Sequence, residues 1–175
     1  TVGGKTYTSG SLIAANNDEF LTRGKENVSY QVLFEPTDRI ALGELSSTKS
    51  YLVLDVMDTV KSQLQFYKIS SDGSAFEYVG GDLEAKIRSS SIQALDSTSS
   101  DEFWFTTSGY TQPTTLYMGN ADLVKDQADS SSTSELPEPY VTKQIKSLPP
   151  QYNSDAVTVI QKQATSKDGT QIPYF

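Results

Sequence analysis

The chain has 175 residues and a formal charge of −8, with 14 Lys and Arg against 22 Asp and Glu. Its acidic residues are scattered and its basic residues form no cluster, so the sequence lacks the electropositive footprint of a nucleic-acid-binding protein. No cysteine occurs, which excludes disulfides and thiolate metal sites and fits either the cytoplasm or the periplasm. No run approaches the roughly 20 apolar residues that cross a bilayer, so we expect no membrane-spanning helix.

Histidine is also absent, and this is the firmest chemical constraint in the sequence. A Ser-His-Asp or Cys-His arrangement cannot be assembled from this chain alone, and the commonest zinc sites lose both preferred ligands. The Gly-x-Ser-x-Gly elbow of the hydrolases does not occur either. We therefore predict no catalytic residue, no metal ligand set and no cofactor-binding residue in this chain.

Short runs of strand-forming residues, separated by polar turns, recur along the whole chain. Residues 62–69 alternate for most of their length, with Leu64 and Phe66 on one face, which is typical of a half-buried strand. Asp72 and Gly73 then form a turn, because both tolerate the left-handed backbone of a tight reversal. In chain order, the predicted strands cover residues 10–14, 32–34, 40–45, 51–56, 62–69, 75–79, 102–107, 114–118 and 141–145.

The order of these strands repeats. Leu12, Leu64 and Leu116 lie at a constant spacing of 52 residues, and each precedes a turn or insertion and then a further strand. Four strands per unit at a period of about 50 residues are typical of β-propeller blades. Neither a Gly-His nor a Trp-Asp pair occurs, which disfavours the WD40 version. The sequence thus predicts an all-β fold, a partial β-propeller of about two to three four-stranded antiparallel blades.

Two breaks in composition interrupt the pattern. The stretch from Asp122 to Pro139 is rich in Asp and Ser and too polar to pack, and Pro137 and Pro139 stiffen its exit. We interpret it as a surface loop inserted between the last two strands of one blade. A second break falls at Pro149-Pro150, where two missing amide donors stop a strand ladder.

The C-terminal part carries recognisable motifs. Residues 146–152 read Lys-Ser-Leu-Pro-Pro-Gln-Tyr, and residues 165–175 contain Ser-Lys-Asp-Gly-Thr followed by Ile-Pro. Together they resemble the junction between the propeller and the hydrolase domain in the prolyl oligopeptidase family. Residues 108–117 resemble a turn in the final blade of that family, and residues 3–14 and 32–37 are similar to its bacterial members.

The resemblance implies a two-domain serine peptidase. A seven-bladed propeller would cover an α/β-hydrolase active site and restrict access of folded proteins, while short peptides are cleaved after proline. None of the family's three catalytic positions has a counterpart in this sequence, so none is carried over. We expect a non-catalytic fragment whose partners are the remainder of its own polypeptide and, in the intact enzyme, a peptide substrate. Exposed blade edges would also allow self-association.

This interpretation divides the chain into four parts. Residues 1–38 would supply the outer strands of one blade, 39–83 a full blade, and 84–150 a second full blade with a loop insertion near 122–139. Residues 151–175 would form a linker and the first strand toward the hydrolase domain. Two alternatives stay open: a stand-alone propeller-like module that binds a protein or peptide, and an acidic surface-layer or adhesin domain.

Three further motifs resemble binding sites but have simpler explanations. Gly3-Gly4-Lys5-Thr6 ends like a phosphate-binding loop, yet the first Gly of that motif and the preceding strand are absent, so we interpret it as a turn. Asp122, Asp126 and Asp129 lack the spacing, the Gly and the final Glu of a calcium-binding EF-hand, and a solvated loop explains them better. Asn27-Val28-Ser29 is a glycosylation sequon by pattern only.

Residues on the predicted strands raise two more candidates. Asp55 and Asp58 suggest a carboxylate pair, but residues three apart on a strand point to opposite faces, whereas retaining glycosidases need carboxyls roughly 5 Å apart. We therefore expect Asp55 to accept a hydrogen bond from the backbone or a hydroxyl, and Asp58 to end the strand. Phe103 and Phe105 should face one way and Trp104 the other, with all three covered by neighbouring blades.

Overall fold

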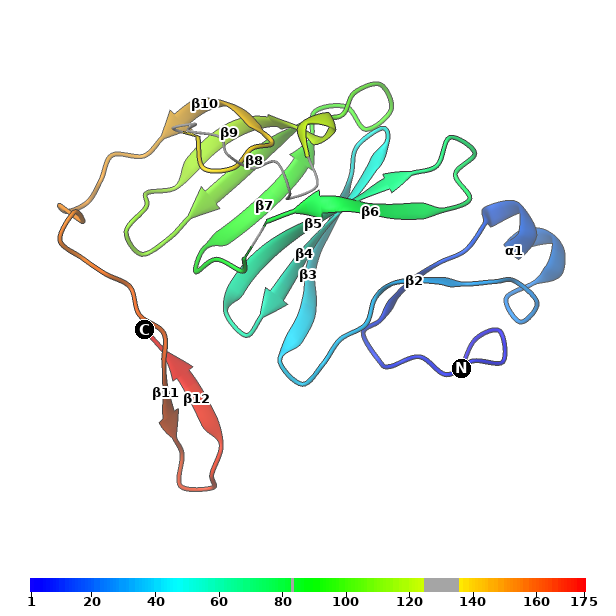
Figure 1. Ribbon diagram of the computed structural model, residues 1–175, viewed down its shortest axis with the longest axis horizontal. Coiled ribbons are helices and arrows are strands. Elements are labelled where there is room, and N and C mark those ends of the chain that lie inside the picture. The colour runs from blue at the N-terminus through cyan, green and yellow to red at the C-terminus, as the bar shows by residue number, and fades with distance from the viewer. Residues whose placement is uncertain (83, 125–135) are drawn as a thin grey trace.

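Most of the chain forms two four-stranded antiparallel sheets (Figure 1). The computed structural model describes residues 1–82, 84–124 and 136–175, and the fold is all-β, with 46% strand and 6% helix. The first sheet has the order β3-β4-β5-β6 and the second sheet the order β10-β9-β8-β7. Their strands are β3 (Ile40–Ser47), β4 (Tyr51–Asp58), β5 (Lys61–Ile69), β6 (Phe76–Gly81), β7 (Ser89–Ala94), β8 (Glu102–Ser108), β9 (Thr115–Asn120) and β10 (Val141–Ser147).

Two shorter ladders flank the sheets. The N-terminal ladder pairs β1 (Leu12–Ala14) with β2 (Gln31–Phe34), and α1 (Asn17–Arg23) lies between them in the chain. The C-terminal hairpin pairs β11 (Lys162–Thr165) with β12 (Gln171–Tyr174), so the last segment holds two strands where one was expected. A 3₁₀ turn, η1 (Ala121–Leu123), follows β9. Within the described residues, no helix has the length and apolar character needed to span a membrane.

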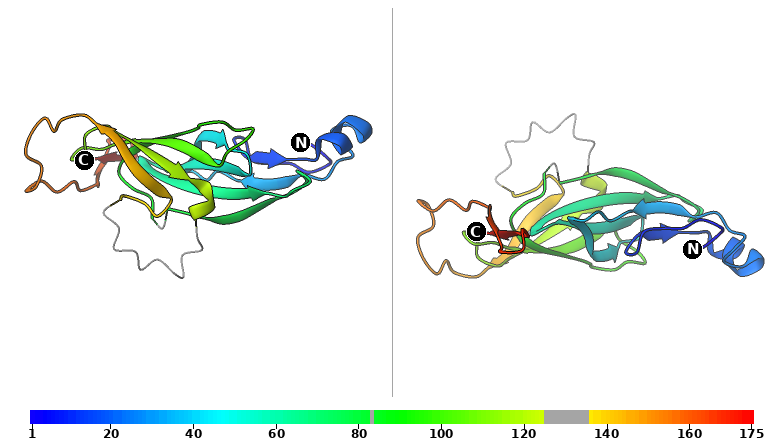
Figure 2. Two further views of the ribbon diagram at one scale, coloured as in Figure 1. Left: turned by 90° about the horizontal axis from the view of Figure 1, so that it is seen from above. Right: turned by 90° about the horizontal axis from the view of Figure 1, so that it is seen from below.

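The units follow one another along the long axis of the molecule. The N-terminal ladder packs on one face of the first sheet, and the second sheet packs on the other face (Figure 1). Figure 2 shows the same arrangement from above and below, with α1 at one end and the linker to the C-terminal hairpin at the other. Each sheet is a meander in which consecutive strands pair, which is the pattern of a propeller blade.

The apolar run of β4 is explained by burial on both of its faces. Tyr51 and Val53 face the second sheet and join a core that contains the fully buried Phe66 and Phe103, whose ring centroids lie 6.0 Å apart. Leu54, which is also fully buried, faces the N-terminal ladder. A strand covered on both sides has no need of polar alternation, so its sequence is continuously hydrophobic.

The predicted repeat of the three leucines is confirmed. Leu64 on β5 is buried against the second sheet, and Leu12 on β1 packs against the first sheet. Leu116 lies opposite Thr106 on the face of the second sheet that points away from the first sheet. Each leucine therefore faces the unit that follows it along the axis, and for Leu116 no such unit is present among the described residues.

The alternation of the aromatic residues on β8 is also confirmed. Phe103 and Phe105 are fully buried between the sheets, and Trp104 lies on the outer face of the second sheet. Trp104 is half-buried, because no unit among the described residues covers its side of the sheet, so the expectation that a neighbouring blade covers it stays a prediction. The strand β7 and the helix α1 were not predicted. The serine-rich sequence of β7 hides its strand pattern, although Ser90 and Ile92 alternate inward.

Gly119 on β9 is a direct probe of the packing between the strands. A Cβ added there would lie 2.5 Å from the ring of Phe103 and 2.9 Å from the carbonyl oxygen of Tyr140. We expect Gly119→Ala to lower the free energy of unfolding by about 1–3 kcal/mol, because a filled core resists extra volume. Urea denaturation measures this. Gly109→Ala is the control, since its Cβ meets atoms only at 3.5 Å or more, and equal stability of the two variants would contradict the packing described here.

Candidate functional site

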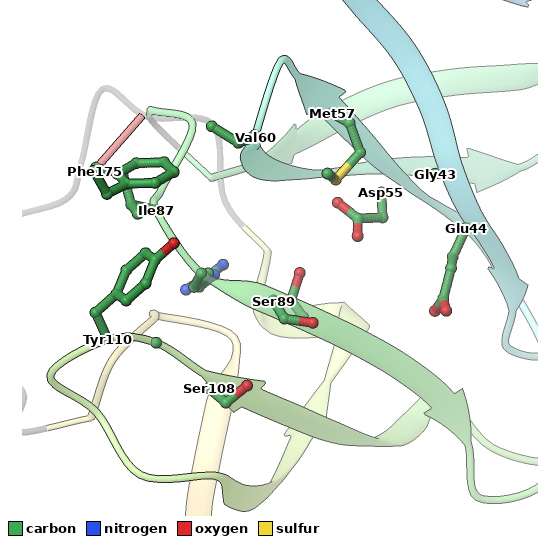
Figure 3. A pocket seen from close by; sticks show the side chains of 13 residues that line it. Gly43, Glu44, Asp55, Met57, Val60, Ile87, Ser89, Ser108, Tyr110 and Phe175 are labelled. Atoms are coloured by element: carbon green, nitrogen blue, oxygen red, sulfur yellow. The ribbon is translucent and has the colours of Figure 1, made fainter. Parts of the chain in front are cut away.

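A cavity of about 720 Å³ lies between the two sheets, close to the contact between β3 and β7. Figure 3 shows its side chains, which come from both sheets and from the C-terminus. The first sheet and its β4–β5 turn contribute Gly43, Glu44, Asp55, Met57 and Val60, and the second sheet with its flanking turns contributes Ile87, Arg88, Ser89, Ser90, Ser108, Gly109 and Tyr110, while Phe175 completes the lining. This volume is in the range of small-molecule and peptide sites.

Asp55 anchors a chain of hydroxyl groups that crosses from one sheet to the other. Its Oδ1 accepts a hydrogen bond of 2.6 Å from Ser62 Oγ, and Ser62 Oγ lies 2.5 Å from Ser90 Oγ on β7. Because the Ser62 hydroxyl donates to Asp55, the Ser90 hydroxyl donates to Ser62. The predicted structural role of Asp55, accepting a hydroxyl hydrogen bond, is confirmed.

The Asp55 carboxyl is poorly stabilised in its charged form. The residue is only 7% exposed, and burial raises the pKa of this carboxyl above its ordinary value. The hydrogen bond from Ser62 opposes the shift, Glu44 adds to it, Arg88 again opposes it and Asp82 adds a further small increase. Asp55 is thus a buried acid that lacks a direct cationic partner.

A second polar group, the ionic network, joins the crossover between the sheets to the start of β10. Its members are Asp82, Lys86, Arg88, Glu138 and Tyr140. Arg88 Nη2 donates to Asp82 Oδ2 at 2.6 Å and Arg88 Nη1 donates to Glu138 Oε1 at 2.5 Å, while Lys86 also pairs with Glu138. The Tyr140 hydroxyl donates to Asp82 Oδ1 at 2.7 Å. Arg88 and Lys86 neutralise the negative charges of Asp82 and Glu138. The network therefore has a structural role, connecting the two sheets.

Burial and charge act in opposite directions on the central guanidinium. The Arg88 side chain is 7% exposed, and although burial alone would lower its pKa, the neighbouring Asp82 and Glu138 carboxylates raise that pKa above the ordinary value. The Arg88 Cζ also lies over the Phe105 ring, 5.2 Å from the ring centroid. The Nε–H of Arg88 is buried and has no hydrogen-bond partner. Arg88 therefore stays charged and fixed in place.

These groups do not form a catalytic centre. Ser62 is fully buried, and the Ser90 hydroxyl, although Ser90 lines the cavity, is engaged in its hydrogen bond with Ser62. The nearest acid, Asp55, is a weak base for serine activation, and the chain has no histidine to relay the proton. Across the described residues, no three His, Cys, Asp or Glu side chains are grouped so as to hold a metal ion.

The structure does not bring together the other candidate site residues that the sequence suggested. Asp58 forms an exposed ion pair of 3.3 Å with Arg39 and does not meet Asp55 in a site. Asp122 accepts a hydrogen bond from the Tyr51 hydroxyl at 3.0 Å, whereas Asp126 and Asp129 lie outside the described residues. Gly3 and Gly4 form a tight turn closed by the bridge between Val2 and Lys5, as expected.

The ionic network and the cavity were missed by sequence reasoning. Asp82, Arg88 and Glu138 belong to loops and strand ends, where no periodicity marks a residue as buried. Glu138 is separated from Arg88 by 50 residues, so spacing along the chain carries no signal of their contact. The sequence gives no sign that Glu138, which lies between Pro137 and Pro139, is buried.

Arg88 tests the importance of the ionic network. Arg88→Met leaves Asp82 and Glu138 buried with a single partial counter-ion, Lys86, and we expect a loss of about 3–5 kcal/mol in the free energy of unfolding. The matched control is Arg39→Met, which removes a solvent-exposed ion pair and should cost less than about 1 kcal/mol. Chemical denaturation of both variants measures the difference, and similar losses would show that the network contributes little.

The chain is similar in sequence and fold to parts of larger peptidases. No described protein family matches the chain. It is 26% identical over 175 residues to an uncharacterised peptidase, y4nA, of Sinorhizobium fredii, and the alignment covers 98% of this chain but 21% of that protein. A post-proline cleaving enzyme from Rickettsia typhi superposes with a TM-score of 0.69 and 20% identity, over 97% of this chain and 22% of that one.

Two other solved structures show the same likeness. Prolyl oligopeptidase B from Galerina marginata gives a TM-score of 0.61 at 16% identity, over 93% of this chain and 20% of that one. Oligopeptidase B from Trypanosoma brucei gives 0.55 at 16% identity, over 99% and 24%. The chain therefore spans about a fifth of the length of the proteins it matches, and its two sheets have the fold of the propeller region of prolyl oligopeptidases.

Proposed function

We propose that this chain is a non-catalytic portion of a prolyl-oligopeptidase-like serine peptidase, in which the propeller admits short peptides to a hydrolase domain that cleaves after proline. The likeness to post-proline cleaving enzymes over nearly all of this chain supports the proposal, as does the likeness to a curated peptidase. In this role, residues 39–83 and 84–150 are two complete blades, residues 1–38 are the outer strands of the blade before them, and residues 151–175 lead toward the hydrolase domain.

The outer face of the second sheet is the observation that carries the proposal. A hollow of about 250 Å³ lies on it, lined by Ser91, Gln93, Trp104, Thr106 and Leu116. The repeat places Leu116 where Leu64 contacts the next sheet, so this face is built to receive a further four-stranded unit. The remainder of the polypeptide would supply that unit, which makes it the principal partner of this chain.

The edges of the sheets bear on self-association. Strand β10 is the outermost strand of the second sheet and places Lys143 and Lys146 on its exposed side, and charged edge residues hinder pairing with another chain. On β6, the Gln31 side chain bonds both the N–H and the C=O of Phe76, at 3.0 and 2.5 Å. With these edges partly blocked, we propose that self-association occurs chiefly through the uncovered face around Trp104.

A stand-alone binding module is the second candidate function. The half-buried Trp104 and the adjacent hollow favour it, because an aromatic residue beside a hollow is a common anchor for a peptide. A module of this kind would be monomeric and would need no further blade to cover the outer face. The peptidase proposal, in contrast, requires a further blade to cover the outer face.

Hydrolysis of a fluorogenic reporter peptide tests the proposed function. The chain alone should give no turnover of a blocked Gly-Pro reporter, because it has neither histidine nor a nucleophile elbow. The full polypeptide that contains the chain should cleave this reporter but not a Gly-Ala reporter, and it should cleave the Gly-Pro peptide far faster than the same sequence within a folded protein. Turnover by the chain alone, or a full polypeptide with no preference for proline, would refute the proposal.

A further inference from the structure

The cavity between the sheets holds two carboxylates without counter-ions. Glu44 and Asp55 project from the first sheet toward Ser89 on β7, and Tyr110 and Phe175 lie on the opposite side of the cavity (Figure 3). Among the described residues, no Lys or Arg lies within ion-pair distance of either carboxylate. The hydrogen bond from Ser62 occupies only Oδ1 of Asp55.

The backbone of β3 brings these two acids together. Between Leu42 and Leu45 the register with β4 shifts, so that Gly43 and Glu44 both lie opposite the single residue Asp55. Such a β-bulge redirects side chains at a strand edge. The cavity-lining part of β3 thereby presents a second carboxylate next to a buried one.

The cation that also lines the cavity is already engaged. Arg88 directs its two terminal nitrogens at Asp82 and Glu138, and Lys86 shares Glu138. Two carboxylates and two cations balance within the ionic network. Neither Arg88 nor Lys86 is therefore free to neutralise the two cavity carboxyls. Glu44 is exposed to solvent, whereas Asp55 is buried, where a charge without a partner is costly.

Apolar side chains share the other walls of the cavity with three serines. Met57, Val60 and Ile87 line it beside the acids, and the rings of Tyr110 and Phe175 lie with centroids 5.1 Å apart at its rim. A ligand that fits these walls has an apolar stem and a cationic head. In addition, the buried Nε–H of Arg88 is a hydrogen-bond donor without an acceptor, and a peptide carbonyl would satisfy it.

We propose that this cavity is a binding site for the lysine or arginine side chain of a peptide, with its cationic head between Glu44 and Asp55 and its aliphatic stem against Met57 and Val60. A bound cation restores the charge balance of the cavity and favours the ionised form of Asp55. The proposal concerns binding by this chain itself, so it does not rest on the peptidase role, and its test involves no hydrolysis.

Calorimetric titration of the 175-residue chain with blocked five-residue peptides tests the proposal. An Ala-Ala-Lys-Ala-Ala peptide should bind at least about tenfold more tightly than its norleucine counterpart, because norleucine keeps the stem but lacks the charge. Spermidine serves as a second probe that carries amines without a peptide backbone. Weaker binding of spermidine than of the lysine peptide supports a peptide ligand, whereas tighter binding of spermidine would overturn that assignment.

Variants of the two acids locate the site. Glu44→Gln and Asp55→Asn should each weaken binding of the lysine peptide about tenfold or more and leave binding of the norleucine peptide unchanged. Glu77→Gln, which removes an exposed charge on β6 outside the cavity lining, should bind like the parent chain. Glu44 is exposed, so its variant keeps the fold even if that of Asp55 does not. The proposal fails if the lysine peptide does not bind, or if Glu44→Gln and Glu77→Gln behave alike.

Discussion

Both faces of the first sheet are apolar, and this constrains the whole molecule. One face of β4 contributes Tyr51 and Val53 to one core, and the other contributes Leu52 and Leu54 to a second core. A four-stranded sheet of this kind is stable only when a neighbour covers each side, since burial of apolar area is its main source of stability. The N-terminal ladder covers one side and the second sheet covers the other, so stacking of units is a requirement of the sequence.

Polar contacts fix how neighbouring sheets meet. Arg88 lies at the entrance to the second sheet and binds Asp82, which ends the first sheet, while Asp101 at the other end accepts hydrogen bonds from Thr48 and the backbone of Ser50. Apolar burial is non-directional, whereas these hydrogen bonds have defined directions and so fix the orientation of one sheet against the other.

The fold could be predicted from the sequence where periodicity and burial coincide. The alternation of residues 62–69 and the equal spacing of Leu12, Leu64 and Leu116 are signals within the sequence, and they predicted strands and a repeat of four-stranded units. The candidate site could not be predicted in the same way. Gly43 inside a predicted strand is a weak sign of the β-bulge at this point, but it does not identify which side chains the bulge brings together. The contact of Arg88 with Glu138 depends on the tertiary fold.

The central claim is that the outer face of the second sheet is an unfilled packing surface, and sedimentation velocity over a range of chain concentrations tests it most directly. We expect association that increases with concentration and is lost in Trp104→Glu, because a charge at this position opposes burial of the face. Leu21→Glu, on the exposed surface of α1 and 72% exposed in the parent, should associate like the parent. A parent chain that stays monomeric throughout, or association that Trp104→Glu does not change, would contradict the account.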